Sequence, residues 1–228
     1  YHDIEHTMQG TLCLARLLHG RSRAGALPVL DERMARLGLW AILLHDTGYL
    51  KRLEDTAGTG AKYTVTHVSR SADFAAGFLA RRGCAEGEIR AVQNMIRCTG
   101  INANLRAIPF GSEAERITGY ALATADLLGQ MSAEDYLEKL PVLYAEFAEA
   151  ARFTGDQSQF VASFASAEDL VRRTPAFWEE YVLPKLKGEL GGLYRFLSDP
   201  YPDGRNDYVE RVEANMAELK RKLAERGG

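Results

Sequence analysis

The segment Leu43-Leu44-His45-Asp46-Thr47-Gly48-Tyr49 closes a strongly apolar run that Asp31 is placed to cap as a helix. Apolar residues recur at helical spacing in almost every long segment of the chain. The alternation of apolar and polar residues that marks a strand is not convincing in any of them. The sequence therefore predicts an all-α protein in which His45 and Asp46 stand at the end of an apolar helix.

The helical pattern breaks at turns rich in glycine and proline, and these breaks set the expected boundaries. Helices are expected over residues 4–18, 31–44, 66–83, 86–98, 112–128, 133–153, 158–197 and 206–226. The apolar side of the first helix is expected to carry Ile4, Met8, Leu12, Ala15 and Leu18. Proline is expected to interrupt the longest segment at Pro175 and Pro184.

Two local features refine this outline. Ser112 is followed three residues later by Glu115, which predicts a capping box at the start of the helix that carries Asp126. The weakest seam in the pattern lies near residues 154–157. We therefore expect one domain over residues 1–153 and a helical extension over residues 154–228 that packs on it.

Composition limits the classes of partner. The net charge of −3 over 228 residues gives no reason to expect bulk nucleic acid or an anionic membrane, so any phosphate-bearing substrate must be held by a local site. No apolar run approaches the roughly 18 residues of a membrane span. The three cysteines are scattered and form no CxxC pair, which favours a reducing, cytoplasmic location.

Histidine is scarce, and three of the five histidines lie in two short segments, residues 1–7 and 43–49. The five histidines are His2, His6, His19, His45 and His67. His2 and His6 are four residues apart, which puts them on one face of a helix, and His45 is followed directly by Asp46. Asp126 is the one carboxylate within Ala123-Thr124-Ala125-Asp126-Leu127-Leu128-Gly129.

Each of these residues also has an ordinary structural interpretation. A single histidine at a helix end is usually satisfied by a backbone carbonyl or the helix dipole, and His19 beside Gly20 is expected to be of this kind. Asp126 alone could cap a helix or pair with an arginine. As a set, however, neutral imidazoles and ionised carboxylates are good ligands for divalent ions, and a bound cation would remove the cost of burying them.

Four motifs in this order resemble the HD superfamily of metal-dependent phosphohydrolases. They are YHxxxHT at residues 1–7, LLHDTGY at 43–49, THxxRSA at 66–72 and ATADLLG at 123–129. The resemblance covers about residues 1–130 and implies an HD-domain helical bundle, here with an additional C-terminal helical lobe. It also implies that the metal ligands are His6, His45, Asp46 and Asp126.

The resemblance assigns roles to two further histidines. His2 matches the residue that donates a proton to the leaving oxygen in phosphodiesterase members, and His67 matches one that binds a second metal or the substrate phosphate. Two departures narrow the class. Tyr49 replaces the second histidine of the HDxxH pattern found in animal-type cyclic-nucleotide phosphodiesterases, and no histidine follows His67. We therefore expect one divalent ion (Mn, Mg, Fe, Co, Ni or Zn) rather than two, and no di-iron oxygenase.

The expected reaction is hydrolysis of a phosphomonoester or phosphodiester, with nucleotides among the candidate substrates. Asp46 or Asp126 would orient the attacking hydroxide, and His2 would protonate the leaving alkoxide. A phosphate also needs cationic partners. Besides His67, the cations near the motifs are Lys51, Lys62, Arg70 and Arg97.

Two other functions stay open. The chain could be a metal-binding HD-type signalling or interaction module with little or no turnover. The full set of metal ligands argues against this, because members that have lost activity usually lose ligands as well. The aromatic C-terminal half could be an interaction lobe, although such a stripe is more often core. The sequence leaves the substrate, the metal and the oligomeric state undetermined.

Overall fold

The computed structural model describes residues 1–154 and 163–227, and within these ranges the protein is all-α, as predicted, with no β-strand. The α-helices are α1 (Ile4–Arg23), α2 (Glu32–Leu44), α3 (His67–Ala80), α4 (Glu86–Ile96), α5 (Glu113–Met131), α6 (Tyr136–Thr154), α7 (Ala167–Ala176), α8 (Leu183–Lys187) and α9 (Asp207–Gly227). Short 3₁₀ turns occupy Thr47–Tyr49, Gly60–Tyr63 and Arg97–Thr99. No helix in the described ranges has the length and apolar character needed to cross a membrane.

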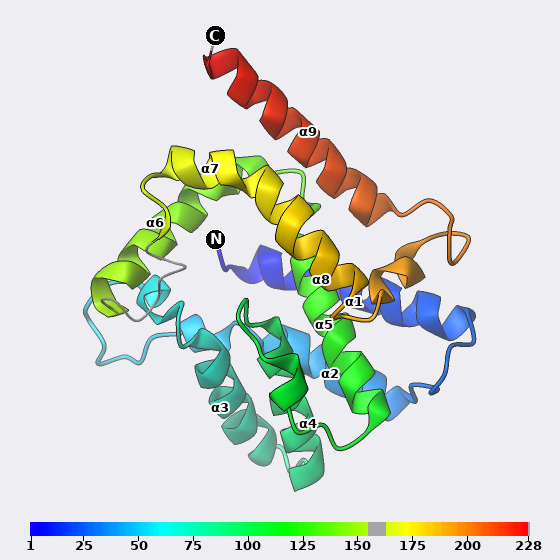
Figure 1. Cartoon of the computed structure of the whole chain (residues 1–228). Helices are drawn as coiled ribbons and strands as arrows, with labels where there is room; N and C mark the ends of the chain where they lie inside the picture. The colour runs from blue at the N-terminus through cyan, green and yellow to red at the C-terminus, as the bar shows by residue number, and fades with distance from the viewer. Residues whose placement is uncertain (155–162, 228) are drawn as a thin grey trace.

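Helix α5 runs through the middle of the molecule and is buried on nearly all sides (Figure 1). It packs against α1, α2, α4 and α9, and its Leu122 and Leu128 meet the core that Leu14, Leu17 and Ile42 complete. A helix that is apolar all round is stable only when other helices cover it. Asp126 is therefore a carboxylate inside the core helix, with only 8% of its surface exposed to water.

Helices α6 to α9 complete the structure. The chain from α7 to α8 passes through a π-helical turn, Phe177–Val182, and α9 packs against α5, α6 and α7. The amide of Asn215 on α9 donates to the carbonyls of Met131 and Ala133, at 2.9 and 3.0 Å. In Figure 1 the C-terminal end of α9 extends beyond the other helices. The domain seam expected at residues 154–157 lies almost wholly outside the described residues.

The α-helix is interrupted close to both expected prolines: α7 ends at Ala176, a π-helical turn covers Phe177–Val182, and α8 begins at Leu183. Pro175 lies inside α7, and Pro184 lies in the first turn of α8, which continues directly from the π-helical turn. The π-helical turn begins two residues after Pro175. The helical run ends at Gly188, before two glycines with positive φ, Gly191 and Gly192. The expected helix start at residue 158 is outside the described residues.

The expected apolar face of α1 was wrong, because its members Ile4, Met8 and Leu12 are 75%, 54% and 50% exposed. The buried face carries His6, Gly10, Cys13, Leu14 and Leu17. This face is buried because α1 packs closely against α5, and Gly10 permits the close approach. The helix also continues to Arg23, so the exposed His19 lies within it and not at its end.

The capping box at α5 forms only in part. Ser112 Oγ accepts from the Glu115 backbone N–H at 3.1 Å, as predicted. Glu115 does not return a bond to Ser112; its carboxylate accepts from the Gly111 N–H and from the Asn94 amide, both at 2.9 Å. The cap therefore ties α5 to α4 as well as starting the helix.

Candidate metal centre

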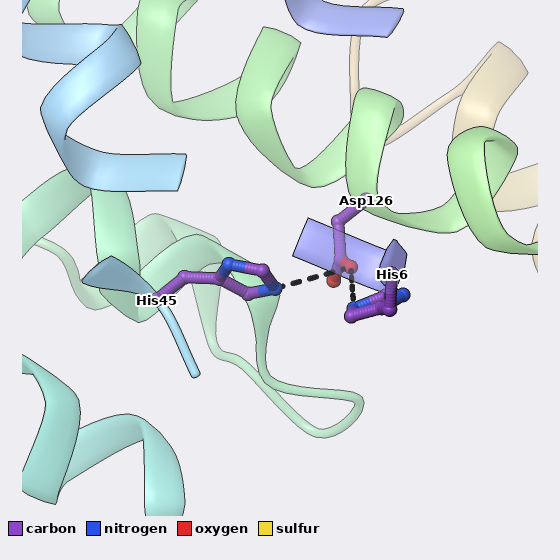
Figure 2. Close-up of side chains that lie close together, drawn as sticks. All are labelled: His6, His45 and Asp126. Carbon is purple, nitrogen blue, oxygen red and sulfur yellow. Dashed lines mark ion pairs between the residues drawn. The ribbon is translucent and has the colours of Figure 1, made fainter. Parts of the chain in front are cut away.

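Three helices deliver the predicted ligands to one point. His6 comes from the first turn of α1, His45 from the end of α2 and Asp126 from the middle of α5, while Asp46 follows His45 directly. Figure 2 shows His6 and His45 turned toward the carboxylate of Asp126. Nitrogen and oxygen atoms of these three side chains lie within 4.8 Å of one another. Residues far apart in the sequence thus form one cluster.

The distances in the cluster suit a shared ion. His6 Nε2 lies 3.2 Å from Asp46 Oδ2 and 3.2 Å from Asp126 Oδ1. His45 Nε2 lies 3.3 Å from each of the same two oxygens. Two ligand atoms bound at about 2.1 Å are about 3.0 Å apart at a right angle and about 3.4 Å apart at the tetrahedral angle. All four measured distances fall between these limits.

The ligand atoms are also buried without adequate partners. His45 Nε2, Asp46 Oδ2 and Asp126 Oδ1 make no hydrogen bond of normal geometry, and neither does His6 Nδ1. Buried polar atoms are nearly always hydrogen-bonded, and leaving one unpaired costs about 1–3 kcal/mol. Three such atoms facing one another are hard to explain by stability, but they fit a divalent cation.

In the absence of a cation the two carboxylates hold protons on the imidazoles. Burial opposes a charged imidazolium, yet Asp126 and Asp46 raise the pKa of His6 to about 10. Burial likewise opposes charge on His45, and the same carboxylates raise its pKa to about 9. Burial would raise the pKa values of Asp46 and Asp126, but the imidazoles hold both well below the usual range. The four groups therefore form a charge-balanced cluster that a cation can enter by displacing protons.

Backbone carbonyls fix two of the imidazole rings. His45 Nδ1 lies 2.6 Å from the Ile42 carbonyl, which can only accept, so Nδ1 carries the proton and Nε2 faces the cluster. His67 Nδ1 is held in the same way by the Thr64 carbonyl at 2.6 Å, and its Nε2 lies 3.9 Å from Asp46 Oδ1. Burial lowers the pKa of His67. In its neutral form His67 Nε2 is an acceptor, which suits a cation or a proton donor better than a phosphate oxygen.

The turn after Asp46 is held against α3. The Gly48 N–H donates to Ser71 Oγ at 2.8 Å, and a Cβ at Gly48 would lie 2.0 Å from the His67 carbonyl oxygen. Arg70 donates to the carbonyls of Gly48 and Leu50, at 2.7 and 2.9 Å. The motifs at residues 43–49 and 66–72 are therefore two sides of one contact that positions His45 and Asp46.

Contacts within the protein change the interpretation of three of the expected phosphate-binding cations. The guanidinium of Arg70 is engaged by the two carbonyls and stacks 3.5 Å from the centre of the Tyr63 ring. Lys51 Nζ donates to the Gly58 carbonyl at 2.5 Å, and Lys62 pairs with Asp55. None of the three lines the cavity described below. Arg97 does line it, and its guanidinium donates to Asn94 Oδ1 at 2.9 Å.

A cavity of about 920 Å³, here called the site cavity, opens from the cluster. It is bounded by α5, α6, α7, the π-helical turn and the loop at residues 99–103, and His2, His6, Asp46, His67 and Asp126 all reach it. A cavity of this size can hold a complete small-molecule ligand. The candidate centre is therefore accessible to a substrate as well as buried.

His2 and His67 flank Tyr49 at the cavity wall. The Tyr49 ring is stacked on both imidazoles, with centroids 4.4 Å from His2 and 4.6 Å from His67. His2 Nδ1 lies 2.6 Å from Glu146 Oε2 on α6, which fixes the ring and leaves Nε2 as its other nitrogen. Sequence analysis missed Glu146, because one glutamate among several on an amphipathic helix carries no distinguishing signal. Tyr49 had been noted only as a departure from HDxxH.

Neither the curated proteins nor the solved structures compared with this chain include a match. The profile of the Npun_R2479-like family matches residues 1–198, a range that includes every residue of the candidate centre, so the chain belongs to this family.

Proposed function

We propose that the chain is a metal-dependent phosphohydrolase of the HD type, with one divalent ion held by His6, His45, Asp46 and Asp126. The observation that carries the proposal is the convergence of His6, His45 and Asp126, whose ligand atoms lie within 4.8 Å of one another, with Asp46 Oδ2 3.2 Å from His6 Nε2 and 3.3 Å from His45 Nε2. The order of the motifs along the chain supports the reaction class, since the same ligand order characterises HD phosphohydrolases. The adjoining site cavity supports an enzyme rather than a closed structural site.

A divalent ion in such a site lowers the pKa of bound water and neutralises charge that develops on phosphorus. The protein would supply the remaining groups. Asp46 Oδ1 is the oxygen not directed at the two ligand imidazoles and could accept a proton from the attacking water. His2, with Nδ1 held by Glu146, would donate from Nε2 to the leaving oxygen. In the balanced reaction, water oxygen bonds to phosphorus, the ester P–O bond breaks and the alcohol leaves with a proton.

The test is a panel of phosphomonoesters and phosphodiesters assayed after chelation and reloading with Mn, Mg, Co or Ni. His6→Ala should lose both bound metal and turnover. His19→Ala is the matched control, because it removes an exposed histidine from the same helix. One bound equivalent with no turnover on any ester would contradict the hydrolase and favour a metal-binding interaction module. Metal bound equally by both variants would contradict the centre itself.

A further inference from the structure

The site cavity is far larger than a phosphate group requires, and most of its wall is apolar. Away from the cluster it is lined by Leu127, Met131, Leu140, Leu143, Phe147 and Phe164. Ligand sites of about 300–1,000 Å³ hold molecules of drug size, and this one, at about 920 Å³, is near the upper end. An ester of a small, polar alcohol would leave this wall facing water. The wall fits a substrate with an apolar body.

A buried cation also lines this cavity, on a different element from the ligands. Lys185 of α8 is only 8% exposed, and its ammonium donates to the Tyr181 hydroxyl at 3.1 Å. That hydroxyl in turn donates to the Ile101 carbonyl. Among the described residues the nearest carboxylate oxygen is on Glu189, 3.8 Å away on a side chain that is 65% exposed. The ammonium can donate three hydrogen bonds, but within the described ranges it has one neutral acceptor, the Tyr181 hydroxyl, and no buried carboxylate at ion-pair distance.

Burying an ammonium without a close anion is costly, and proteins usually avoid it. Lys185 lines the same cavity as the candidate metal centre, but none of the described ion pairs or hydrogen bonds joins it to His6, His45, Asp46 or Asp126. An anionic group on the ligand would supply the missing counter-charge. Arg173 lines the cavity as well, but its guanidinium is shared with Asp169 at 3.6 Å and the Ser163 carbonyl at 3.0 Å.

We propose that the substrate is an elongated, amphiphilic phosphoester with its reacting phosphate at the metal centre, an apolar body along the apolar wall of the site cavity and a second anionic group at Lys185. This inference rests on the proposed function for the identity of the reacting end. The distal group is a carboxylate or a second phosphate, since both have the charge that an ammonium binds. Simple nucleotides, which lack an apolar body, are expected to be poor substrates.

Non-hydrolysable ligands test the binding mode without requiring turnover. Titration calorimetry would compare n-alkylphosphonates of increasing length with ω-carboxyalkylphosphonates and α,ω-bisphosphonates of the same lengths. Affinity should rise about fourfold for each added methylene until the wall is covered. Beyond a threshold length, one of the two distal acids should bind at least about tenfold more tightly than the plain alkyl ligand, as a charge-assisted bond would give. The stronger of the two identifies the distal group.

Lys185→Met should remove the advantage of the distal acid and leave the affinity for plain alkylphosphonates unchanged. Lys185→Arg should retain part of that advantage. Lys187→Met is the matched control, because it neutralises an exposed lysine of the same short helix. If Lys185→Met weakens plain and acidic ligands equally, or if affinity does not depend on chain length, the inference is overturned.

Hydrolysis of the corresponding phosphate esters, measured in parallel, separates the two proposals. If the rate of ester hydrolysis depends neither on the chain length of the ester nor on Lys185, the result supports the hydrolase and contradicts the proposed substrate class. The predicted binding pattern without turnover of any ester supports the ligand class and contradicts the hydrolase. Where both hold, Lys185→Met should raise KM for esters with a distal acid and leave kcat unchanged, because the lost contact acts on ground state and transition state alike.

Discussion

Gly10 of α1 and Gly129 of α5 bring two helix backbones into contact: a Cβ added at Gly129 would lie 2.9 Å from the Cα of Gly10. His6 stands four residues before Gly10, and Asp126 stands three residues before Gly129, so both ligands leave their helices within about one turn of this contact. The separation of 3.2 Å between His6 Nε2 and Asp126 Oδ1 therefore depends on a helix crossing that glycine permits.

We expect Gly129→Ala to weaken metal binding. The added methyl must push α1 and α5 apart, and overpacking of this kind costs about 1–3 kcal/mol. Loss of the groups that position metal ligands typically lowers affinity about 10–100-fold, and a similar loss is expected here. Competition with a chelator of known affinity measures it. Gly87→Ala is the control, because a Cβ at that helical position meets nothing within 4 Å and should leave metal affinity unchanged.

Asp46→Ala should remove metal binding while leaving the helical content intact. Asp46 lies on the turn after α2 and contributes charge that no other residue at that corner replaces. A metal at about 100 times its Kd stabilises the folded state by about 2.7 kcal/mol. Metal addition should therefore raise the Tm of the parent by about 5–10 °C and that of Asp46→Ala by almost nothing. Full metal occupancy in the variant, measured by elemental analysis, would exclude Asp46 as a ligand.

The cluster should make the chelated protein less stable as the pH rises. The folded-state pKa values of His6 and His45, about 10 and about 9, exceed the unfolded value of about 6.5. Their contribution is fully present below about pH 6.5 and is lost as the pH rises through 9 to 10. The free energy of unfolding of the chelated protein should fall across this window, as denaturant titrations at several pH values can show. A flat profile would mean that the imidazoles are neutral without metal.

Metal uptake should show the opposite trend over the same range. Because the cation must displace the protons from His6 and His45, binding near pH 7 should release up to about two protons per ion and should strengthen as the pH rises. Calorimetry in buffers of different ionisation enthalpy counts these protons. In His19→Ala the number should not change, because that residue is exposed and outside the cluster. Uptake without proton release would contradict the charge-balanced cluster.

Much of the fold and of the candidate cluster could be predicted because the relevant signals are local. The helix that ends at His45 shows its apolar run and its Asp31 cap within one short segment, and Asp31 does accept from the Met34 N–H at 2.7 Å. The scarcity of histidine and the isolation of Asp126 in an apolar helix drew attention to these residues, and the resemblance to HD phosphohydrolases then implied the set of four ligands. Those features are visible in the order of residues and need no knowledge of packing.

The parts that sequence could not supply depend on which way a side chain points after packing. Ile4 and Met8 suggested the wrong face of α1, because the approach to α5 is decided by Gly10 and not by apolar spacing. Glu146 and Lys185 come from α6 and α8, far from the motifs in sequence, and join the site cavity only through tertiary structure. The position of an arginine or lysine next to a motif did not show whether the side chain contacts the substrate or stabilises the fold.

Variants of Arg70 and Arg97 test whether each arginine contacts the substrate or only stabilises the structure. Arg70→Ala removes two hydrogen bonds to the carbonyls of Gly48 and Leu50, so it should lower stability by about 2–3 kcal/mol and leave KM for phosphate esters nearly unchanged. Arg97 is exposed and lines the site cavity, so Arg97→Ala should raise KM with little change in Tm. The reverse pattern would restore Arg70 as a phosphate-binding residue.

His2 is expected to act on turnover and not on metal affinity. Its Nδ1 is held by Glu146 at 2.6 Å, and its ring centroid lies 5.6 Å from that of His6, so it borders the cluster without joining the four ligand atoms. A general acid contributes about 10²–10⁴-fold in rate. His2→Ala should lose that factor on alkyl esters, whose alkoxide needs a proton, and much less on p-nitrophenyl esters, whose phenolate leaves without one.

Glu146→Gln completes the test. The amide retains the size of Glu146 and a hydrogen-bond acceptor but removes the negative charge beside His2, so it should reproduce part of the His2→Ala loss, again mainly on alkyl esters. Metal content should stay at the parental level in both variants. Equal losses on the two classes of ester would exclude proton donation by His2. Loss of metal from His2→Ala would make His2 a ligand, and the interaction with Glu146 would then serve to orient that ligand, as outer-shell carboxylates do for metal-binding histidines.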